Sequence, residues 1–243
     1  MPKSSGLPLW CAAASCTDVG AIFVTATGTD VGKTFVTAGI IKLLRSQGAS
    51  VDALKPVVSG YDPSVAETSD PAVLLKALGR PVSAEEVARI SPFRFRAPLS
   101  PDMAAAQESR VLDFRELVAF TQRAIDTTKG HLFIEGVGGI MVPLDARRTM
   151  LDWMTSVRAP LLLVVGSYLG TISHTLTALH VLAQRKLDIA AIVVSESERS
   201  HVPLDETVAS IQHFANDIDV IGLPRLPGGL TDHPAFAQIS ARL

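Results

Sequence analysis

Cysteine is scarce in this sequence. The 243 residues include two cysteines, Cys11 and Cys16, and both lie within the first twenty positions. They show no metal-binding spacing with each other or with histidine, and they do not form the pattern of a disulfide framework. Because structural disulfides are typical of oxidising compartments, their absence favours a reducing one, and we expect a cytoplasmic protein.

Long apolar runs and a large net charge are also missing. The longest apolar stretch, APLLLVVG at 159–166, is far shorter than the ~18 residues that a membrane-spanning helix requires. The net charge is −2 and the basic residues form no cluster, so we expect neither a membrane nor nucleic acid as a partner. Residues 1–20 contain one lysine and a short, interrupted apolar part, which predicts a poorly ordered extension rather than a signal peptide.

Apolar residues are abundant, at 47% of the chain with a mean hydropathy of +0.31. This content suits strands that are buried on both faces, as in a parallel sheet covered by helices. Short β-branched runs alternate with helical patterns along the chain, and no internal repeat or linker interrupts them. We therefore predict a single α/β domain over residues 21–243, with a mostly parallel sheet and helices on both faces.

The individual elements follow from apolar periodicity and from turn and cap signals. Strands are expected at 21–27, 51–56, 160–166, 188–195 and 219–224, and a further strand begins at 131 and runs into a glycine-rich loop that ends at 139. Helices are expected near 32–48, 68–79, 102–109, 113–128, 171–186 and 204–216. Residues 80–101 contain four prolines and are expected to wrap the surface.

The stretch FVTATGTDVGKTFVTAG, residues 23–39, has the character of a phosphate-binding loop between the first strand and the first helix. The strict pattern G-x-x-x-x-G-K-[ST] would place its first glycine at position 27, where Thr27 stands, and Gly28 comes one place late. The context still predicts the function, because loop N–H groups and the helix dipole favour a phosphate at this point. Lys33 would bridge the terminal phosphates and Thr34 would offer its hydroxyl to Mg²⁺.

Three charged residues stand near the expected carboxyl edge of the sheet, where open α/β sheets bind ligands. Lys55 follows the second strand and would neutralise a transferring phosphoryl group, or it is only a solvated lysine before a turn. Glu135 ends a strand before several glycines and suits an Mg²⁺ ligand, or else it is a capping or surface carboxylate. For Asp70 the position alone favours the N-cap of a helix over a metal ligand.

Six stretches occur in one order along the chain: VTATGTDVGKT, LKPVVSG, TSD, LSPDMAAAQE, IEGVGG and VVGSYLGTISHTLTAL. Together they closely resemble the dethiobiotin synthetase family, over residues 21–224. The resemblance implies a fold of the phosphate-loop NTPase type, with ATP and Mg²⁺ as cofactors. The implied reaction joins CO₂ to 7,8-diaminopelargonic acid and closes a ureido ring through a carbamic–phosphoric anhydride, giving dethiobiotin, ADP and phosphate.

The resemblance also implies roles for individual residues. Catalytic contacts would come from Lys33, Lys55 and Thr29. The nucleotide would be bound by Gly28, Thr29, Asp30, Val31, Gly32, Lys33, Thr34, Ser195 and Pro224. Mg²⁺ would be held by Thr34, Asp70 and Glu135, and the diamine by Thr29, Ser59, Gly138, Leu169 and Ser173. The family works as a homodimer with its active site at the subunit interface, and residues 168–174 match the segment that contacts the partner chain's substrate.

The chain departs from the family at three positions. The family's loop is one residue longer than the strict pattern, and Ala26 stands where its first glycine would be. Ser195 and Ser173 replace asparagines that contact the adenine and the diamine carboxylate. A hydroxyl cannot reproduce the paired donor and acceptor of an amide, so nucleotide choice and the contacts to the substrate tail are left open.

Two other functions are compatible with a phosphate loop. A cobyrinate-type amidotransferase synthetase would carry a glutamine-cleaving domain with a nucleophilic cysteine, but both cysteines here precede the first strand. A partition-type ATPase would carry a signature lysine early in the loop, and residues 26–32 contain no lysine. The sequence therefore favours dethiobiotin synthesis over both.

Overall fold

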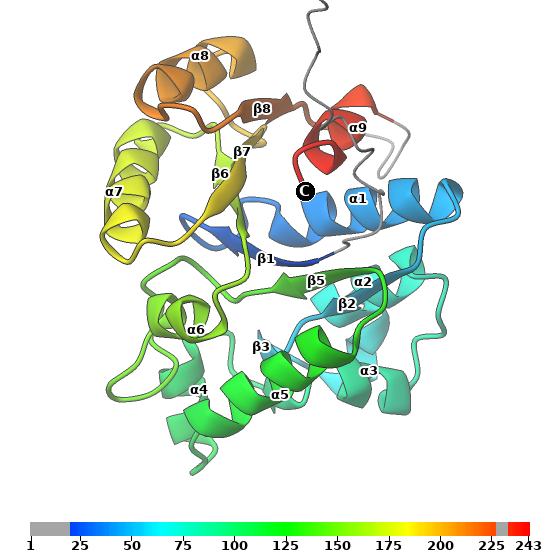
Figure 1. Cartoon of the computed structure of the whole chain (residues 1–243). Coiled ribbons are helices and arrows are strands. Elements are labelled where there is room, and N and C mark those ends of the chain that lie inside the picture. Colours follow the sequence, from blue (N-terminus) through cyan, green and yellow to red (C-terminus); the bar gives the residue numbers. More distant parts are fainter. Residues whose placement is uncertain (1–19, 227–232) are drawn as a thin grey trace, which may run out of the picture.

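A parallel sheet between two layers of helices forms the centre of the protein (Figure 1). The computed structural model describes residues 20–226 and 233–243, so the predicted extension, with Cys11 and Cys16, lies outside the described residues except for Gly20. Among the described residues, the main sheet has six strands in the order β2-β5-β1-β6-β7-β8, and every pairing is parallel. The prediction of a mostly parallel sheet is confirmed.

Each strand of the main sheet lies within one of the predicted ranges. The strands are β1 (Ala21–Ala26), β2 (Val51–Leu54), β5 (His131–Glu135), β6 (Leu161–Gly166), β7 (Ile189–Ser195) and β8 (Val220–Leu223). A smaller sheet pairs β3 (Val57–Ser59) with β4 (Phe93–Phe95), also in parallel. All six residues of β6 are buried, as expected for a central strand with helices on both of its faces.

Helices cover both faces of the main sheet. The helices of the described residues are α1 (Lys33–Ser46), α2 (Asp70–Ala77), α3 (Ala84–Ile90), α4 (Pro101–Gln107), α5 (Phe114–Thr127), α6 (Met150–Val157), α7 (Thr171–Gln184), α8 (Leu204–Phe214) and α9 (Pro234–Ser240), together with the 3₁₀ helix η1 (Pro63–Thr68). Figure 1 shows α1 and α9 on one face, and α6 and α7 on the other. In the part of the chain that the structure describes, no helix combines the length and the apolar character needed to cross a membrane.

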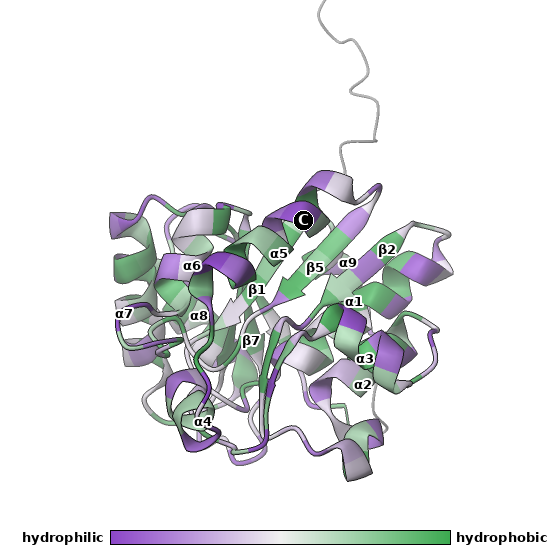
Figure 2. Ribbon diagram, turned by 90° about the horizontal axis from the view of Figure 1, so that it is seen from below, coloured by the Kyte–Doolittle hydropathy of each residue, from purple (hydrophilic) through white to green (hydrophobic). Residues whose placement is uncertain are grey.

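Apolar side chains from both helical layers meet the sheet. Figure 2 shows the hydrophobic residues gathered along β1 and β5, with hydrophilic residues on the outer turns of the helices. On one face, Trp153 of α6 is fully buried, meets the Phe23 ring edge-on at a centroid distance of 4.8 Å, and donates its indole N–H to the Thr121 hydroxyl at 3.2 Å. On the other face, the apolar stripe predicted for the first helix is buried: Val36, Ile40, Ile41 and Leu44.

The prediction that residues 80–101 wrap the surface is wrong. This segment forms α3 and β4, and Ile90 and Phe95 from these elements are buried in the core. The prolines separate elements instead of preventing them, since Pro92 lies between α3 and β4. The letters FRFR at 93–96 alternate with the period of a strand, which is the signal that would have predicted β4. Helices α6 and α9 were likewise not predicted.

The close approach of α9 to α1 generates a prediction for Gly39. A Cβ atom at this position would lie 2.1 Å from the buried ring of Phe236. Overpacking typically costs about 1–3 kcal/mol, while alanine in a helix gains up to about 1 kcal/mol over glycine. We expect Gly39→Ala to lower the free energy of unfolding by about 1–2 kcal/mol, measured by urea denaturation.

Phe236→Ala provides the matched background for this experiment. With the ring removed, a Cβ atom at position 39 would have space, so Gly39→Ala should then be neutral or stabilising. Equal costs of Gly39→Ala in both backgrounds would show that the α1–α9 contact is not what constrains this glycine.

Candidate active site

The loop after β1 leads directly into the N-terminus of α1 and leaves backbone N–H groups free. The first bond within α1 runs from the Val36 N–H to the Gly32 carbonyl at 2.9 Å, so the N–H groups of residues 33–35 have no partner inside the helix. Gly32 is the N-cap and adopts the left-handed conformation, with φ 97°. A Cβ atom on Gly32 would also come within 2.7 Å of the Ser195 hydroxyl oxygen, so this position requires glycine. Free N–H groups at a helix N-terminus form a binding site for a phosphate.

The displaced glycine of the motif has a structural explanation. Ala26 is not in the turn; it is the last residue of β1, is fully buried, and accepts a hydrogen bond from the Ile140 N–H at 3.0 Å. A strand residue has no need for a positive φ, so the alanine methyl is accommodated there. Gly28 has open space around the position of a Cβ atom. The loop therefore keeps its shape although its first glycine does not stand at the position that the strict pattern requires.

Lys33 lies at the base of this loop and is buried. Its ammonium donates hydrogen bonds to the Gly28 carbonyl at 3.1 Å and to the Gly138 carbonyl at 2.9 Å. Burial lowers the pKa of Lys33 from 10.5 to about 8, and the nearby Lys55 ammonium adds to this effect. Because its hydrogen-bond acceptors are neutral carbonyls, this cation keeps its charge available for an anionic ligand.

Lys55 sits in a network of charges at the end of β2, in which Lys55 and Glu135 are buried and Asp70 is exposed. Its ammonium contacts a Glu135 carboxylate oxygen at 2.6 Å, the Gly136 carbonyl at 2.9 Å and an Asp70 carboxylate oxygen at 3.1 Å. Lys55 and Glu135 are 3% and 0% exposed, so the readings of a solvated lysine and a surface carboxylate do not hold. Burial alone would lower the pKa of Lys55, but Glu135 and Asp70 outweigh it and hold the pKa above its usual value.

The prediction that Asp70 is an N-cap is wrong. Ser69 is the N-cap of α2, and Asp70 is the first residue of the helix. Its carboxylate faces Lys55 instead of capping the backbone. Burial works to raise the pKa of Asp70, but the Lys55 ammonium outweighs it and holds the pKa below its usual range. An ion partner that is distant in sequence thus replaces the local cap that the sequence suggested.

The oxygen atoms around Glu135 suit a hard divalent cation. The Thr34 hydroxyl donates to one Glu135 oxygen at 2.6 Å, and the other oxygen of this carboxylate is buried and has no hydrogen-bond partner among the described residues. Asp70 adds a second carboxylate, which also contacts Lys55. Mg²⁺ is typically bound through one or two carboxylates together with phosphate oxygens and water, so this donor set fits it. No group of three or more His, Cys, Asp or Glu side chains suited to a metal occurs in residues 20–226 and 233–243.

A cavity of about 750 Å³ joins these groups. Of the residues predicted for the site, its lining contains Thr29, Asp30, Gly32, Lys33, Thr34, Lys55, Ser59, Asp70 and Gly138. Glu135 lies beneath the lining, in contact with Thr34 and Lys55. The sequence interpretation missed Phe35, Val58, Gly60, Val137, Val142 and the turn of residues 98–101. That turn belongs to the LSPDMAAAQE motif, which was the available signal.

Seven predicted site residues are absent from the cavity lining: Gly28, Val31, Glu135, Ser195, Pro224, Leu169 and Ser173. Ser195 ends β7 and lies beside Gly32 of the phosphate loop. It pairs with Leu223, the residue before Pro224, so the two predicted base contacts lie close to each other, next to this loop. Leu169 is 80% exposed just before α7, and Ser173 is exposed on the first turn of that helix. Within one chain, the predicted site therefore divides into a cavity with its adjoining loop and a separate exposed segment.

Known proteins resemble this chain along most of its length. The model of a family described as "AAA domain" matches residues 20–228. The ATP-dependent dethiobiotin synthetase BioD of Caulobacter sp. (strain K31) is 47% identical over 218 residues, which cover 88% of this chain and 93% of that protein. The protein of the same name from Acidiphilium cryptum (strain JF-5) is 47% identical over 190 residues, covering 78% of this chain and 85% of that protein.

Solved structures share the fold at much lower identity. The septum site-determining protein MinD of Pyrococcus horikoshii OT3, complexed with Mg-ADP, superposes with a TM-score of 0.54 at 18% identity, covering 92% of this chain and 93% of that one. The cell division ATPase MinD of Pyrococcus furiosus gives a TM-score of 0.52 at 19% identity, with coverage of 92% and 98%. At this level of identity, these structures confirm the phosphate-loop NTPase fold and give no information on the reaction. Because relatives 47% identical cover most of both chains, this chain belongs to the family of ATP-dependent dethiobiotin synthetases.

Proposed function

We propose that this protein uses ATP to carboxylate 7,8-diaminopelargonic acid and to close the ureido ring of dethiobiotin. The observation that carries the proposal is that one cavity joins the phosphate loop to two buried lysines and to Asp70, with Glu135 in contact with Lys55 beneath the lining. Its volume of about 750 Å³ is within the range of small-molecule sites. The family relationship adds the substrate class, through relatives named ATP-dependent dethiobiotin synthetase.

The proposed chemistry needs no nucleophile from the protein. One amine of the substrate adds to CO₂ and forms a carbamate, whose oxygen attacks the γ-phosphorus of ATP and displaces ADP. The second amine then attacks the carbamoyl carbon of the resulting anhydride, and phosphate leaves as the ring closes. Catalysis of such steps comes from orientation and from charge stabilisation in the transition state.

The charged side chains of the cavity have distinct tasks in this scheme. Lys33 would move from the Gly28 and Gly138 carbonyls to the terminal phosphate oxygens, where negative charge develops. Lys55 forms ion pairs with Glu135 and Asp70, so its ammonium would stay in place and face the transferring phosphoryl group. Thr34, Glu135 and Asp70 would hold Mg²⁺, which, when bound, neutralises phosphate charge.

We also propose that a second copy of the chain completes the substrate site. The exposed Leu169 and Ser173 lie outside the cavity of their own chain, as expected of residues that contact the substrate of a partner. The homodimer, the cytoplasmic location and the single domain over residues 21–243 belong to the same proposal.

Product analysis separates this function from that of a nucleotide-switched ATPase. Protein, MgATP, bicarbonate and the diamine should together give dethiobiotin, detected by mass spectrometry, and ADP release should need both the diamine and bicarbonate. ADP release that is independent of both compounds, without dethiobiotin, would refute the proposed reaction and favour a switch ATPase.

Lys33→Ala should abolish most of the turnover while the fold is retained. The change removes the ammonium that faces the cavity at the phosphate loop, and loss of one such electrostatic contact typically lowers kcat by roughly 10²–10³. Lys42→Ala, on an exposed position of the same helix, is the matched control and should keep wild-type kcat. Near-normal kcat in folded Lys33→Ala protein would exclude this loop as the catalytic one.

Glu135→Gln should raise the Mg²⁺ concentration needed for half-maximal activity by about tenfold or more, because the amide lacks the charge that the cation requires. The KM for the diamine should change less. The variant also weakens a buried ion pair with Lys55, so its unfolding must be measured alongside. Glu85→Gln, at an exposed position on α3, is the control. A Mg²⁺ titration that overlays the wild type would show that Glu135 is not a ligand.

Base selectivity should be relaxed because Ser195 lacks the amide that would read adenine. A site without such hydrogen bonds cannot strongly reject analogues, so CTP or GTP should support turnover within about tenfold of ATP in kcat/KM. Ser195→Asn should shift the preference towards ATP. An ATP preference above about a hundredfold in the wild type would contradict this prediction and would indicate base contacts made by the backbone near Pro224.

A further inference from the structure

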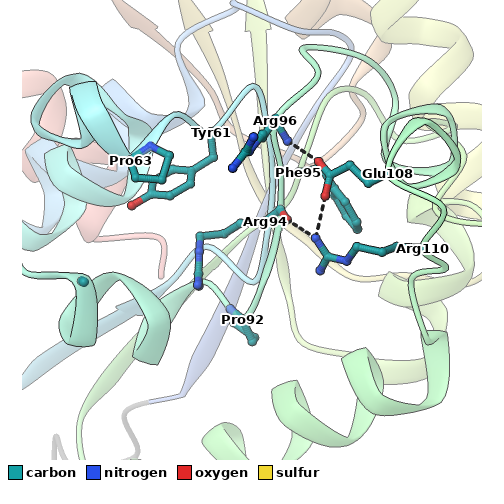
Figure 3. Close-up of a pocket in the computed structure, with 9 residues that line it drawn as sticks. Tyr61, Pro63, Pro92, Arg94, Phe95, Arg96, Glu108 and Arg110 are labelled. Carbon is teal, nitrogen blue, oxygen red and sulfur yellow. Dashed lines mark hydrogen bonds and ion pairs between the residues drawn. The ribbon is translucent and has the colours of Figure 1, made fainter.

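A second cavity, of about 390 Å³, lies on the outer side of the β3–β4 sheet. It shares no lining residue with the main cavity. Figure 3 shows its polar side chains: Tyr61, Arg94, Arg96, Glu108 and Arg110. Three arginines and a single acidic residue therefore contribute to the lining of one small cavity, and the proposed function assigns no role to any of them.

The strand pattern of β4 explains why Arg94 and Arg96 lie on the same side of the segment, whereas Figure 3 shows Arg110 beside Phe95 on the other side. Successive side chains of a strand point to opposite faces. Phe93 and Phe95 point into the core and are buried, so Arg94 and Arg96 share the outer face of the segment. Arg110, just beyond α4, packs its guanidinium over the Phe95 ring at 4.8 Å and donates to the Arg94 carbonyl at 2.9 Å.

The carboxylate in the cavity is already engaged. One Glu108 oxygen accepts the Arg96 backbone N–H at 2.6 Å, and the other accepts from Arg110 at 2.8 Å. The hydrogen bond from the Arg96 backbone N–H and, to a smaller extent, the hydrogen bond from the Arg110 side chain hold the pKa of Glu108 below its usual value. Asp62, outside the lining, interacts with Arg96 at longer range but receives both of its hydrogen bonds from Ser64. Neither acid forms a direct ion pair with the Arg94 or Arg96 side chain.

Two of the guanidinium groups have no acidic partner. Arg94 donates to the Ser91 carbonyl and lies 5.6 Å from the centroid of the Tyr61 ring. Among the residues that the structure describes, no carboxylate lies within ion-pair distance of Arg94 or Arg96, in contrast to the Arg110–Glu108 pair at 2.8 Å. Arginine presents a planar fork of N–H donors that matches carboxylate and phosphate oxygens. Two such groups without an acidic partner, lining the same cavity, are suited to bind a carboxylate or a phosphate.

We propose that this cavity binds a small multivalent oxyanion, whose phosphate or carboxylate groups contact Arg94 and Arg96 while Tyr61 forms one wall. Its volume is at the lower end of the range for ligand sites, which suits a compact anion. The proposal concerns binding alone and does not depend on the proposed reaction.

The position of this oxyanion site relative to the main cavity gives such binding a consequence. Tyr61 directly follows Ser59 and Gly60, which line the main cavity, and Arg96 lies shortly before the lining turn of residues 98–101. The Tyr61 N–H also bonds the Phe95 carbonyl at 2.9 Å, so the two segments are tied together between the cavities. An anion bound here would therefore hold the segments that form one wall of the main cavity.

Isothermal titration calorimetry tests the proposal. The protein is first saturated with Mg²⁺ and a non-hydrolysable ATP analogue, so that the phosphate loop is occupied. Inorganic phosphate and tricarballylate are then titrated separately, and the better ligand identifies phosphate or carboxylate as the preferred group. We expect one saturable site per chain. Arg94→Gln and Arg96→Gln should each weaken binding at least about tenfold, as loss of a charge-assisted hydrogen bond does.

Arg123→Gln, an exposed arginine on α5, is the matched control and should leave the affinity unchanged. Arg96→Lys keeps the positive charge but loses the paired N–H donors of the guanidinium, so it should also weaken binding. Folding of each variant is checked by circular dichroism, and Arg96→Lys replaces a glutamine variant that fails to fold. The absence of saturable heat from wild-type protein with both anions, up to about 10 mM, would overturn the proposal. Equal affinity in wild type and in the Arg94 and Arg96 variants would overturn it as well.

Discussion

The buried carboxylate of Glu135 is the constraint on which the arrangement of the site depends. An ionised group at 0% exposure needs compensating partners, because burial of an unpaired charge costs far more than the fold can supply. Its partners come from two different segments: Lys55 follows β2, and Thr34 is the second residue of α1. The parallel pairing of β5 with β2 and with β1 places both segments at the carboxyl end of β5. Removing one member of such a buried pair typically costs about 3–5 kcal/mol, so the charges that serve the site also fix its geometry.

The two lysines of the cavity are held in physically different ways. Lys55 is bound to carboxylates that raise its pKa, so it remains a fixed cation. Lys33 is bound to carbonyls, and burial has lowered its pKa to about 8. An incoming phosphate would offer Lys33 a stronger partner than the carbonyls do. The site thus combines one ammonium group that is fixed by ion pairs with a second that can turn from carbonyl groups to a bound phosphate without breaking an ion pair.

Much of the fold could be predicted because it depends on local periodicity. The six main strands and the apolar stripe of α1 follow from patterns that neighbouring residues carry. The segment 80–101 was misjudged because its prolines were given more weight than the strand-like alternation FRFR. Asp70 was misjudged for another reason: its partner, Lys55, is distant along the chain, and only the packing of α2 against the sheet edge brings them together. The contribution of residues 98–101 to the cavity wall also depends on tertiary contacts that no local pattern encodes.

The phosphate loop shows how a sequence pattern and a physical requirement can diverge. Two positions around this loop have a positive φ, Asp30 at 57° and Gly32 at 97°. A Cβ atom on Gly32 would also meet a close neighbour, so at this position both the backbone conformation and the available space are specific to glycine. Aspartate is among the residues that tolerate the left-handed region, and Ala26 is still in the strand. Because the loop is one residue longer than the strict pattern, the turn lies after position 26, and position 26 does not require glycine. The groups that would bind a phosphate, which are the free N–H groups at the start of α1 and the Lys33 ammonium, are present as in the strict pattern.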